Sequence, residues 1–219
     1  MKKFIAIAAA LVLFGTQAFA QLSFGAGYLN STETTKTTYK LDGSTSSSSQ
    51  DLNGFYAGAN YTIGLDGIVD GLAVTPGVFA SMLFGANKDN NNVKYQDLGL
   101  NIPLNISYAY ELTNDFKLFA FLGPIFQIGL INKTITKDSN SETKVNNFEN
   151  DIIANTIIKY GRERFNILLG GGLGFEVSEQ FQVMVGYNHS LMNYWDQNTP
   201  FYNTKVSRSQ ITVGVGYNF

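Results

Sequence analysis

The sequence predicts an all-β protein, an eight-stranded antiparallel up-and-down β-barrel that crosses a membrane with its strands. Three observations lead to this prediction: an export signal, a repeated alternation of apolar and polar residues, and connections that alternate between short and long. The chain also has 22 glycines, no cysteine and only 15% charged residues, against an average of about 25% charged. This composition disfavours a disordered chain, a coiled coil and a disulfide scaffold.

The start of the chain has the three parts of a secretory signal peptide. Lys2-Lys3 is the positive region, residues 4–14 (FIAIAAALVLF) are the apolar region, and residues 18–20 (Ala-Phe-Ala) form a cleavage site. The apolar run is too short for an anchor, because such a helix would reach about 16 Å, roughly half of a bilayer core. We therefore expect a signal peptide over residues 1–20 and an exported barrel domain over residues 21–219.

The clearest strand is the last one, Arg208–Phe219. From Ile211 onward its odd positions are apolar, and its even positions are small or polar. An alternation of this length would arise by chance in roughly one window in a thousand. Because successive side chains of a strand point to opposite faces, this segment has one apolar face and one small, polar face.

Seven further segments show the same period of two. The strongest are 97–110, 165–177 and 181–191, and weaker ones cover 22–30, 52–63, 72–84 and 116–131. The connections are short near 64–71, 111–115 and 178–180, and long and polar near 31–50, 85–95, 132–163 and 193–207. Short turns at one end and long loops at the other are typical of outer-membrane barrels. We expect 31–50, rich in Thr and Ser, to be a mobile solvated loop.

A secreted soluble barrel or sandwich would show the same period, so the composition of the two faces has to decide. A soluble barrel carries Lys, Glu and Arg on its outside. Here the polar face consists mostly of Gly, Asn, Ser, Thr and Gln, and most charges lie in the connections. This pattern favours lipid around an apolar outer face and a narrow lumen filled by small side chains. Pro76, Pro103 and Pro124 fall inside strands, so we expect bulges or missing hydrogen bonds there.

Several segments share short motifs with a known family. Residues 95–104 (YQDLGLNIPL) are similar to a Y-x-x-[IL]-P-L strand, 121–125 (FLGPI) to an A-G-P strand, and 164–176 to D-F-G-x-x-x-G-x-G-x-E, from which Arg164 and Asn166 depart. Residues 186–193 are similar to R-Y-x-x-G-L-x-N, from which Gly186 and Ser190 depart. Together they resemble the small outer-membrane β-barrel domain family, often called porin-family or OmpA/OmpX-like barrels.

That resemblance implies a location and partners. It implies a bacterial outer membrane, with lipid around the barrel and the barrel-insertion machinery as a partner during biogenesis. The terminal residues Tyr217 and Phe219 match the aromatic C-terminal signal that this machinery reads. The family has no shared catalytic residue and implies no cofactor.

Few ionisable residues fall on the face that would line the lumen. Asp97 and Arg208 lie toward the long-loop end, and Lys117 and Glu176 toward the short-turn end. A buried charge is costly without a partner. We therefore hypothesise that Asp97 pairs with Arg208 and Lys117 with Glu176, and that both pairs close the lumen. A gate for small ions would use the same residues.

These features predict a structural or surface-interaction barrel that meets extracellular partners through its long loops. A narrow porin-like channel for small solutes or ions is the first alternative, and a lipid A-modifying enzyme is the second. An enzyme needs a nucleophile beside a base. The single histidine, His189, is next to Ser190, but neighbours along a strand point to opposite faces, so we predict no enzyme. One histidine and a net charge of −2 also give no reason to expect a metal site or nucleic acid.

Overall fold

The computed structural model describes residues 20–87, 90, 92–138, 141–148, 151–153, 156–158 and 161–219. Within these residues all regular secondary structure is β-strand, and no helix is long and apolar enough to cross a membrane. The expected signal peptide lies outside the described residues, apart from Ala20, with which the first strand begins.

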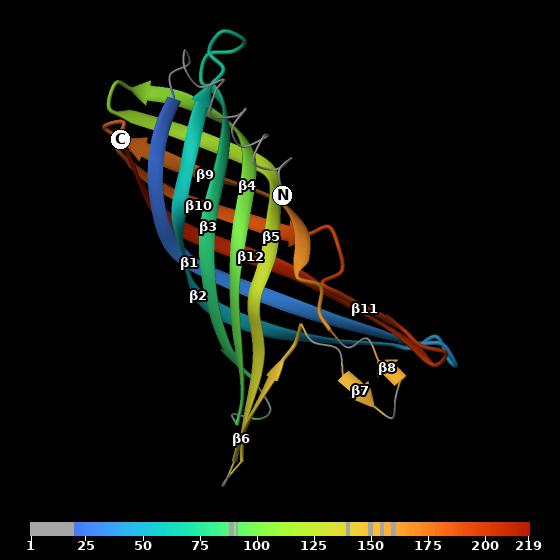
Figure 1. Cartoon of the computed structure of the whole chain (residues 1–219). Helices are drawn as coiled ribbons and strands as arrows, with labels where there is room; N and C mark the ends of the chain where they lie inside the picture. The colour runs from blue at the N-terminus through green and yellow to red at the C-terminus, as the bar shows by residue number, and fades with distance from the viewer. Residues whose placement is uncertain are drawn as a thin grey trace, which may run out of the picture.

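Eight strands form one closed antiparallel ring in up-and-down order, as the sequence predicts (Figure 1). Each pairs with its neighbour in the ring, and β1 also pairs with β12, which closes the barrel. Because the ring is closed, its wall has no free edge. The ring strands are β1 (Ala20–Tyr39), β2 (Thr45–Gly64), β3 (Leu72–Ala86), β4 (Val93–Thr113), β5 (Phe116–Asp138), β9 (Phe165–Val177), β10 (Phe181–Ser190) and β12 (Tyr202–Asn218).

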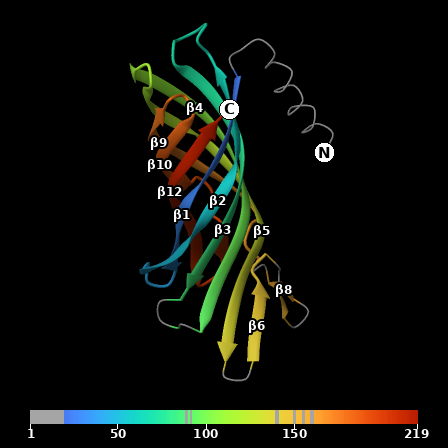
Figure 2. The same cartoon turned by 90° about the vertical axis from the view of Figure 1, so that its left-hand side faces the viewer.

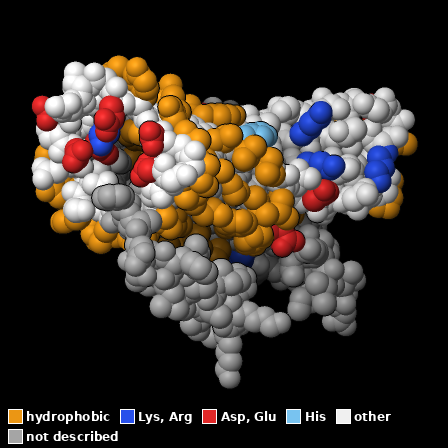
Figure 3. Space-filling model, turned by 90° about the horizontal axis from the view of Figure 1, so that it is seen from above, with side chains coloured by type: hydrophobic (Ala, Val, Ile, Leu, Met, Phe, Trp, Pro, Cys, Tyr) orange, Lys and Arg blue, Asp and Glu red, His pale blue; other side chains and the backbone are white. Residues whose placement is uncertain are grey.

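The outer surface of the wall is apolar. Large apolar side chains alternate along each strand and stay exposed, as at Phe55 (69%), Leu122 (60%) and Leu173 (64%). In Figure 3 the hydrophobic side chains cover the barrel wall, whereas the part that projects beyond it is mostly uncharged polar with a few charges. An apolar belt of this kind is stable only against lipid, because in water it would be an aggregation surface.

Much of the sequence predicted as long loops is strand, so that expectation is wrong. β1 and β2 continue as a hairpin to a short turn at residues 40–44, and together they cover most of 31–50. The alternation of apolar residues could not reveal this extension, because both faces of the hairpin are polar. Thr favours strands through its branched Cβ. The short-turn links at 65–71, 114–115 and 178–180 agree with the prediction.

Four additional short strands lie in the long connections (Figure 1), and two of them, β6 and β8, are also labelled in Figure 2. β6 (Ser141–Asn146) pairs with the end of β5, and β11 (Trp195–Asn198) pairs with β12. β7 (Asp151–Ile153) and β8 (Thr156–Ile158) form a separate two-stranded sheet. The barrel therefore carries structured extensions at its long-loop end.

The ladder is interrupted at the three prolines, which confirms that expectation. Along β3 the register with β4 breaks directly after Pro76, opposite Pro103, and then resumes unchanged. Along β5 the register with β4 breaks at Pro124. Each proline lacks the N–H that the ladder needs, and the closed ring tolerates the gaps because the flanking pairs hold the register.

Candidate functional site in the lumen

Arg208 on β12 joins four strands across the lumen. Its side chain is almost fully buried, with the residue 1% exposed. Nη2 lies 2.5 Å from Asp97 Oδ2 on β4 and 2.5 Å from Glu33 Oε1 on β1. Nη1 donates to Gln127 Oε1 on β5 at 3.1 Å. One guanidinium therefore links β12, β4, β1 and β5.

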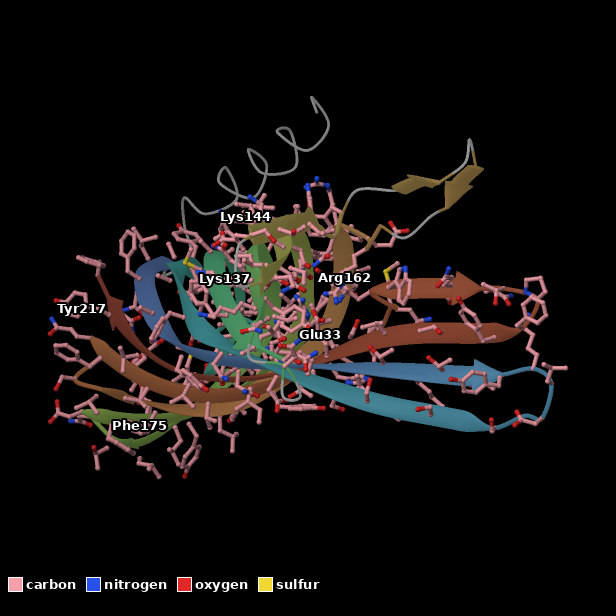
Figure 4. The ribbon with its side chains drawn as sticks, turned by 90° about the horizontal axis from the view of Figure 1, so that it is seen from below. Glu33, Lys137, Lys144, Arg162, Phe175 and Tyr217 are labelled. Atoms are coloured by element: carbon pink, nitrogen blue, oxygen red, sulfur yellow. The ribbon has the colours of Figure 1, made fainter. Side chains whose placement is uncertain are left out.

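A second cation closes this group from the long-loop end. Arg162, in the segment between β8 and β9, donates from Nη1 to Glu33 Oε2 at 2.8 Å and to Oε1 at 3.1 Å (Figure 4). The ring of Tyr194 stacks on both guanidiniums, with its centroid 4.3 Å from Arg208 Cζ and 5.3 Å from Arg162 Cζ. We call Glu33, Asp97, Arg162, Tyr194 and Arg208 the outer cluster.

Amide side chains add hydrogen bonds to the outer cluster, in which Arg208 Nε is buried without a partner among the described residues. Asn132 Nδ2 donates to Asp97 Oδ2 at 2.9 Å and to Tyr194 Oη at 3.2 Å. Gln127 Nε2 donates to Asn101 Oδ1 at 2.8 Å on the side toward the barrel centre. Two carboxylates, two guanidiniums and this amide shell form a network in which each buried charge has a partner, the condition under which a buried ion pair persists.

The second group of charges lies at the short-turn end and is far more open. Lys117 Nζ is 3.1 Å from Glu179 Oε1, 3.2 Å from Glu111 Oε1 and 4.0 Å from Glu176 Oε1. The side chains of Glu111 and Glu179 are 68% and 67% exposed. We call these four residues the inner cluster. Water screens its attractions, so each pair contributes little to stability.

The structure brings together both pairs that the sequence singled out. Asp97 contacts Arg208, and Lys117 reaches Glu176, although its shorter contacts are to the two unpredicted glutamates. Whether these pairs close the lumen stays a proposal. Sequence reasoning also missed three members of the outer cluster: Glu33, Arg162 and Tyr194.

One of the missed residues left a signal in the sequence. Glu33 continues the odd-numbered series of β1, which is mostly small or polar apart from Leu29, beyond residue 30, where the predicted strand ended. Arg162 and Tyr194 lie in segments between strands, where no period applies, so only the folded structure places them.

His189 lies on the outer face of β10 and not in the lumen. Its Nδ1 is 2.9 Å from Ser209 Oγ on β12, whereas Ser190 is buried and donates to Asn166 Oδ1 at 2.9 Å. The two sequence neighbours therefore face opposite sides, as the alternation of a strand requires. In the part of the chain that the structure describes, no three His, Asp or Glu residues gather as a metal site would need.

Comparison with known families decides where this barrel belongs. The family model for the outer membrane protein beta-barrel domain matches residues 6–219. The chain belongs to this family. As an outer membrane protein beta-barrel domain, it resides in the bacterial outer membrane, with lipid around its apolar belt.

Several solved structures are similar to this outer-membrane barrel. Ail, the attachment invasion locus protein of Yersinia pestis, is 12% identical with a TM-score of 0.45, over 91% of this chain and 99% of that one. Neisserial surface protein A is 15% identical with a TM-score of 0.40, over 90% and 97%. OprG from Pseudomonas aeruginosa is 13% identical with a TM-score of 0.39, over 92% and 97%. No curated protein matches the sequence.

The lipid belt of the outer-membrane barrel ends just below the outer cluster. On β1 the exposed Tyr28 is followed on the same face by Asn30, and on β12 Ile211 is preceded by Ser209. Short turns of such barrels face the periplasm, so the outer cluster lies at the extracellular side. There, burial raises the pKa of the Tyr194 hydroxyl to about 12, which keeps this phenol protonated between two cations.

The aromatic end of the chain lies at the opposite, periplasmic rim of the barrel. The rings of Tyr217 and Phe219 are 4.8 Å apart, and Phe219 also packs on Phe24 at 5.6 Å. Phe181 packs on Tyr217 at 5.3 Å. These contacts fix where the aromatic residues sit in the folded barrel, and their use as an insertion signal stays a prediction.

Proposed function

We propose that this outer-membrane barrel is a surface-interaction protein whose contact element is the sheet that projects beyond the lipid belt. The extended parts of four strands form this sheet in the order β2-β1-β12-β11 (Figure 4). We call it the projecting sheet. The observation that carries the proposal is its edge at Thr45–Ser49, which pairs with β1 on one side and, among the described residues, with no strand on the other.

An unpaired edge is a template for another extended chain. Its free backbone N–H and C=O groups can each form ladder hydrogen bonds with an added strand. Natural proteins usually protect such an edge with proline, a bulge or inward-pointing charge. Residues 45–49 (TSSSS) carry none of these devices and are all exposed.

The charge of the projecting sheet favours an acidic partner. Lys36 lies directly opposite Lys205 on β12 and Ser47 on β2, and both lysines are exposed. Asp196 on β11 lies opposite Lys205 on its other side, so Lys36 is the lysine with no carboxylate directly across from it on a neighbouring strand. Like charges opposite each other on neighbouring strands are destabilising, and an anionic segment bound over them would relieve the repulsion. The partner that fits is an extended, acidic segment of an extracellular protein.

The test uses the barrel in lipid nanodiscs and an unfolded acidic chain, reduced and carboxymethylated α-lactalbumin, as the probe. Deletion of residues 36–47 removes most of the edge and should weaken binding at least about tenfold, because most of the ladder bonds and Lys36 are lost together. The matched control shortens the periplasmic link 65–71 and should leave binding unchanged. Equal binding by both variants would refute the proposal.

A narrow channel is the alternative that the outer cluster disfavours. A conducting barrel needs a continuous lumen, and the buried side chains of Arg208, Glu33 and Asp97 meet across it. We propose that the wild-type barrel gives no conductance steps in planar bilayers. Steps that appear in wild type would instead support the channel.

Lipid modification is the second alternative, and the pair His189–Ser209 is the feature that suggests it. The pair lies at the outer margin of the lipid belt, where a base beside a hydroxyl could attack an ester. We propose that it is a polar contact at the lipid surface without catalysis. Mass spectra of lipid A from cells that express wild type or His189→Ala should be identical, and an acyl chain lost only with wild type would show an enzyme.

A further inference from the structure

Below the outer cluster, the lumen is hollow toward the periplasm. A cavity of about 140 Å³ lies at the periplasmic end, beside Lys117 and Glu176. A second cavity of about 110 Å³ lies at mid-barrel and reaches Gln210, one inward position below Arg208. We call the second cavity the inner chamber. The two cavities adjoin, because both are lined by Asn60, Thr75, Asn105, Phe121 and Met184.

Much of the wall of the inner chamber is aromatic or apolar. Tyr56 and Phe79 pack edge to face with centroids 5.8 Å apart, and Phe121 lies across the lumen. Phe121 has room because β9 carries glycine at that level. A Cβ on Gly172 would lie 2.6 Å from Phe121 Cζ. Glycine on β9 therefore leaves the space inside the barrel that the ring of Phe121 occupies.

Two polar groups in this wall are unpartnered. Asn60 Oδ1 and Gln210 Nε2 are buried, and neither has a hydrogen-bond partner among the described residues. Gln210 is only 3% exposed. A buried polar atom without a partner is destabilising, so a molecule that forms a hydrogen bond with either atom removes that cost.

The inner chamber is closed on its extracellular side. Asn101, which lines the chamber, accepts from Gln127, and Gln127 in turn accepts from Arg208 of the outer cluster. The periplasmic cavity, in contrast, opens beside the exposed inner cluster. The lumen is thus a blind pocket with its mouth in the periplasm.

We propose that the inner chamber binds a small aromatic molecule with a group that both donates and accepts a hydrogen bond, taken up from the periplasm. The inner chamber alone, at about 110 Å³, is smaller than the apolar cavity of about 150 Å³ that holds one benzene ring, so the bound molecule also occupies part of the adjoining periplasmic cavity of about 140 Å³. The ring would lie against Phe79 and Phe121, and the polar group would satisfy Asn60 or Gln210. This proposal is independent of the projecting sheet.

The test measures binding of benzamide to the folded full-length barrel in detergent micelles by titration NMR, with toluene as the apolar comparison. Benzamide should bind saturably and about tenfold more tightly than toluene, because only benzamide can pair with the chamber's polar atoms. Gln210→Leu should weaken benzamide about tenfold and leave toluene unchanged or tighter.

A filling substitution and a matched control place the site. Met184→Trp, inside the chamber, should weaken both probes at least about tenfold, since the indole occupies their space. Met82→Trp, on the lipid-facing side, should change neither. The heat-dependent gel shift reports folding of each variant, and if Met184→Trp does not fold, Gln210→Leu decides. No saturable benzamide binding to the wild type, or equal binding by wild type and a folded Met184→Trp, would overturn the proposal and leave a chamber that holds water.

Discussion

The outer and inner clusters both place charged side chains inside a narrow barrel, but the outer cluster buries them in balanced pairs and the inner cluster leaves them open to water. The outer cluster balances two guanidiniums against two carboxylates, and Arg208 and Asp97 have side chains exposed by only 2% and 5%. The inner cluster sets one lysine among three glutamates, two of which are largely exposed. Only the buried group needs exact neutrality, because only there is an unpaired charge removed from water.

Because the two clusters differ in burial, their charge pairs should contribute differently to the stability of the barrel. Attraction between charges near a protein surface is several-fold weaker than in the interior. We therefore propose that the outer cluster holds the lumen together, whereas the inner cluster is a solvated rim.

Arg208→Leu should have the largest effect. The substitution removes the cation that Glu33 and Asp97 share, while both carboxylates stay buried. The free energy of unfolding should therefore fall by about 3–5 kcal/mol. Urea unfolding of the barrel in micelles, followed by tryptophan fluorescence or gel mobility, measures this. If the free energy of unfolding fell no more than it does for Lys117→Leu, the two clusters would contribute equally to stability and the proposed difference would be wrong.

Asp97→Asn should have the next largest effect. Asparagine keeps the shape but removes the charge that faces Arg208, so the free energy of unfolding should fall by about 1–3 kcal/mol. The temperature at which the folded gel band disappears should fall with it. Unchanged heat stability would remove the motive for a structural Asp97–Arg208 pair.

Tyr194→Phe should lower the free energy of unfolding by about 1 kcal/mol, because the ring stays on both guanidiniums while the hydroxyl that accepts from Asn132 is lost.

The same variant tests the raised pKa of the Tyr194 hydroxyl. Folded wild type keeps the Tyr194 proton up to about pH 12, whereas an unfolded tyrosine loses it near pH 10. Stability from this group is therefore complete below about pH 10 and falls as the pH rises toward 12. The difference in phenolate absorbance between wild type and Tyr194→Phe should appear near pH 12; a difference near pH 10 would contradict its burial.

Lys117→Met should have the smallest effect, below about 1 kcal/mol, since its partners are exposed and screened. The little that is lost should shrink further in about 1 M salt, where the screening length is only about 3 Å. Urea unfolding at two salt concentrations measures both. A salt-independent loss above that limit would mean that the inner cluster is effectively buried.

The sequence was sufficient for the parts of this molecule that repeat with a fixed period. Apolar alternation located the eight membrane strands, and the same parity put Asp97 and Arg208 inside the barrel. It could not locate the projecting sheet, where Thr34, Ser47 and their neighbours give two polar faces and no contrast. Nor could it place Arg162 or Tyr194, whose positions depend on how the long connections fold back over the lumen.

The seam between β1 and β12 has a consequence for assembly. All other neighbouring strands of the ring follow one another along the chain, so they can pair early. In contrast, Ser23 on β1 and Asn218 on β12 form a hydrogen bond although 195 positions separate them in the sequence. Contacts of such separation form late. Arg208 lies on the last strand and contacts Glu33 on the first, so the full charge network assembles only when the circle is complete. A chain truncated before β12 would leave two unpaired strand edges and would lack the guanidinium that Glu33 and Asp97 share, so Asp97 would lose its cation and Glu33 would keep Arg162 alone.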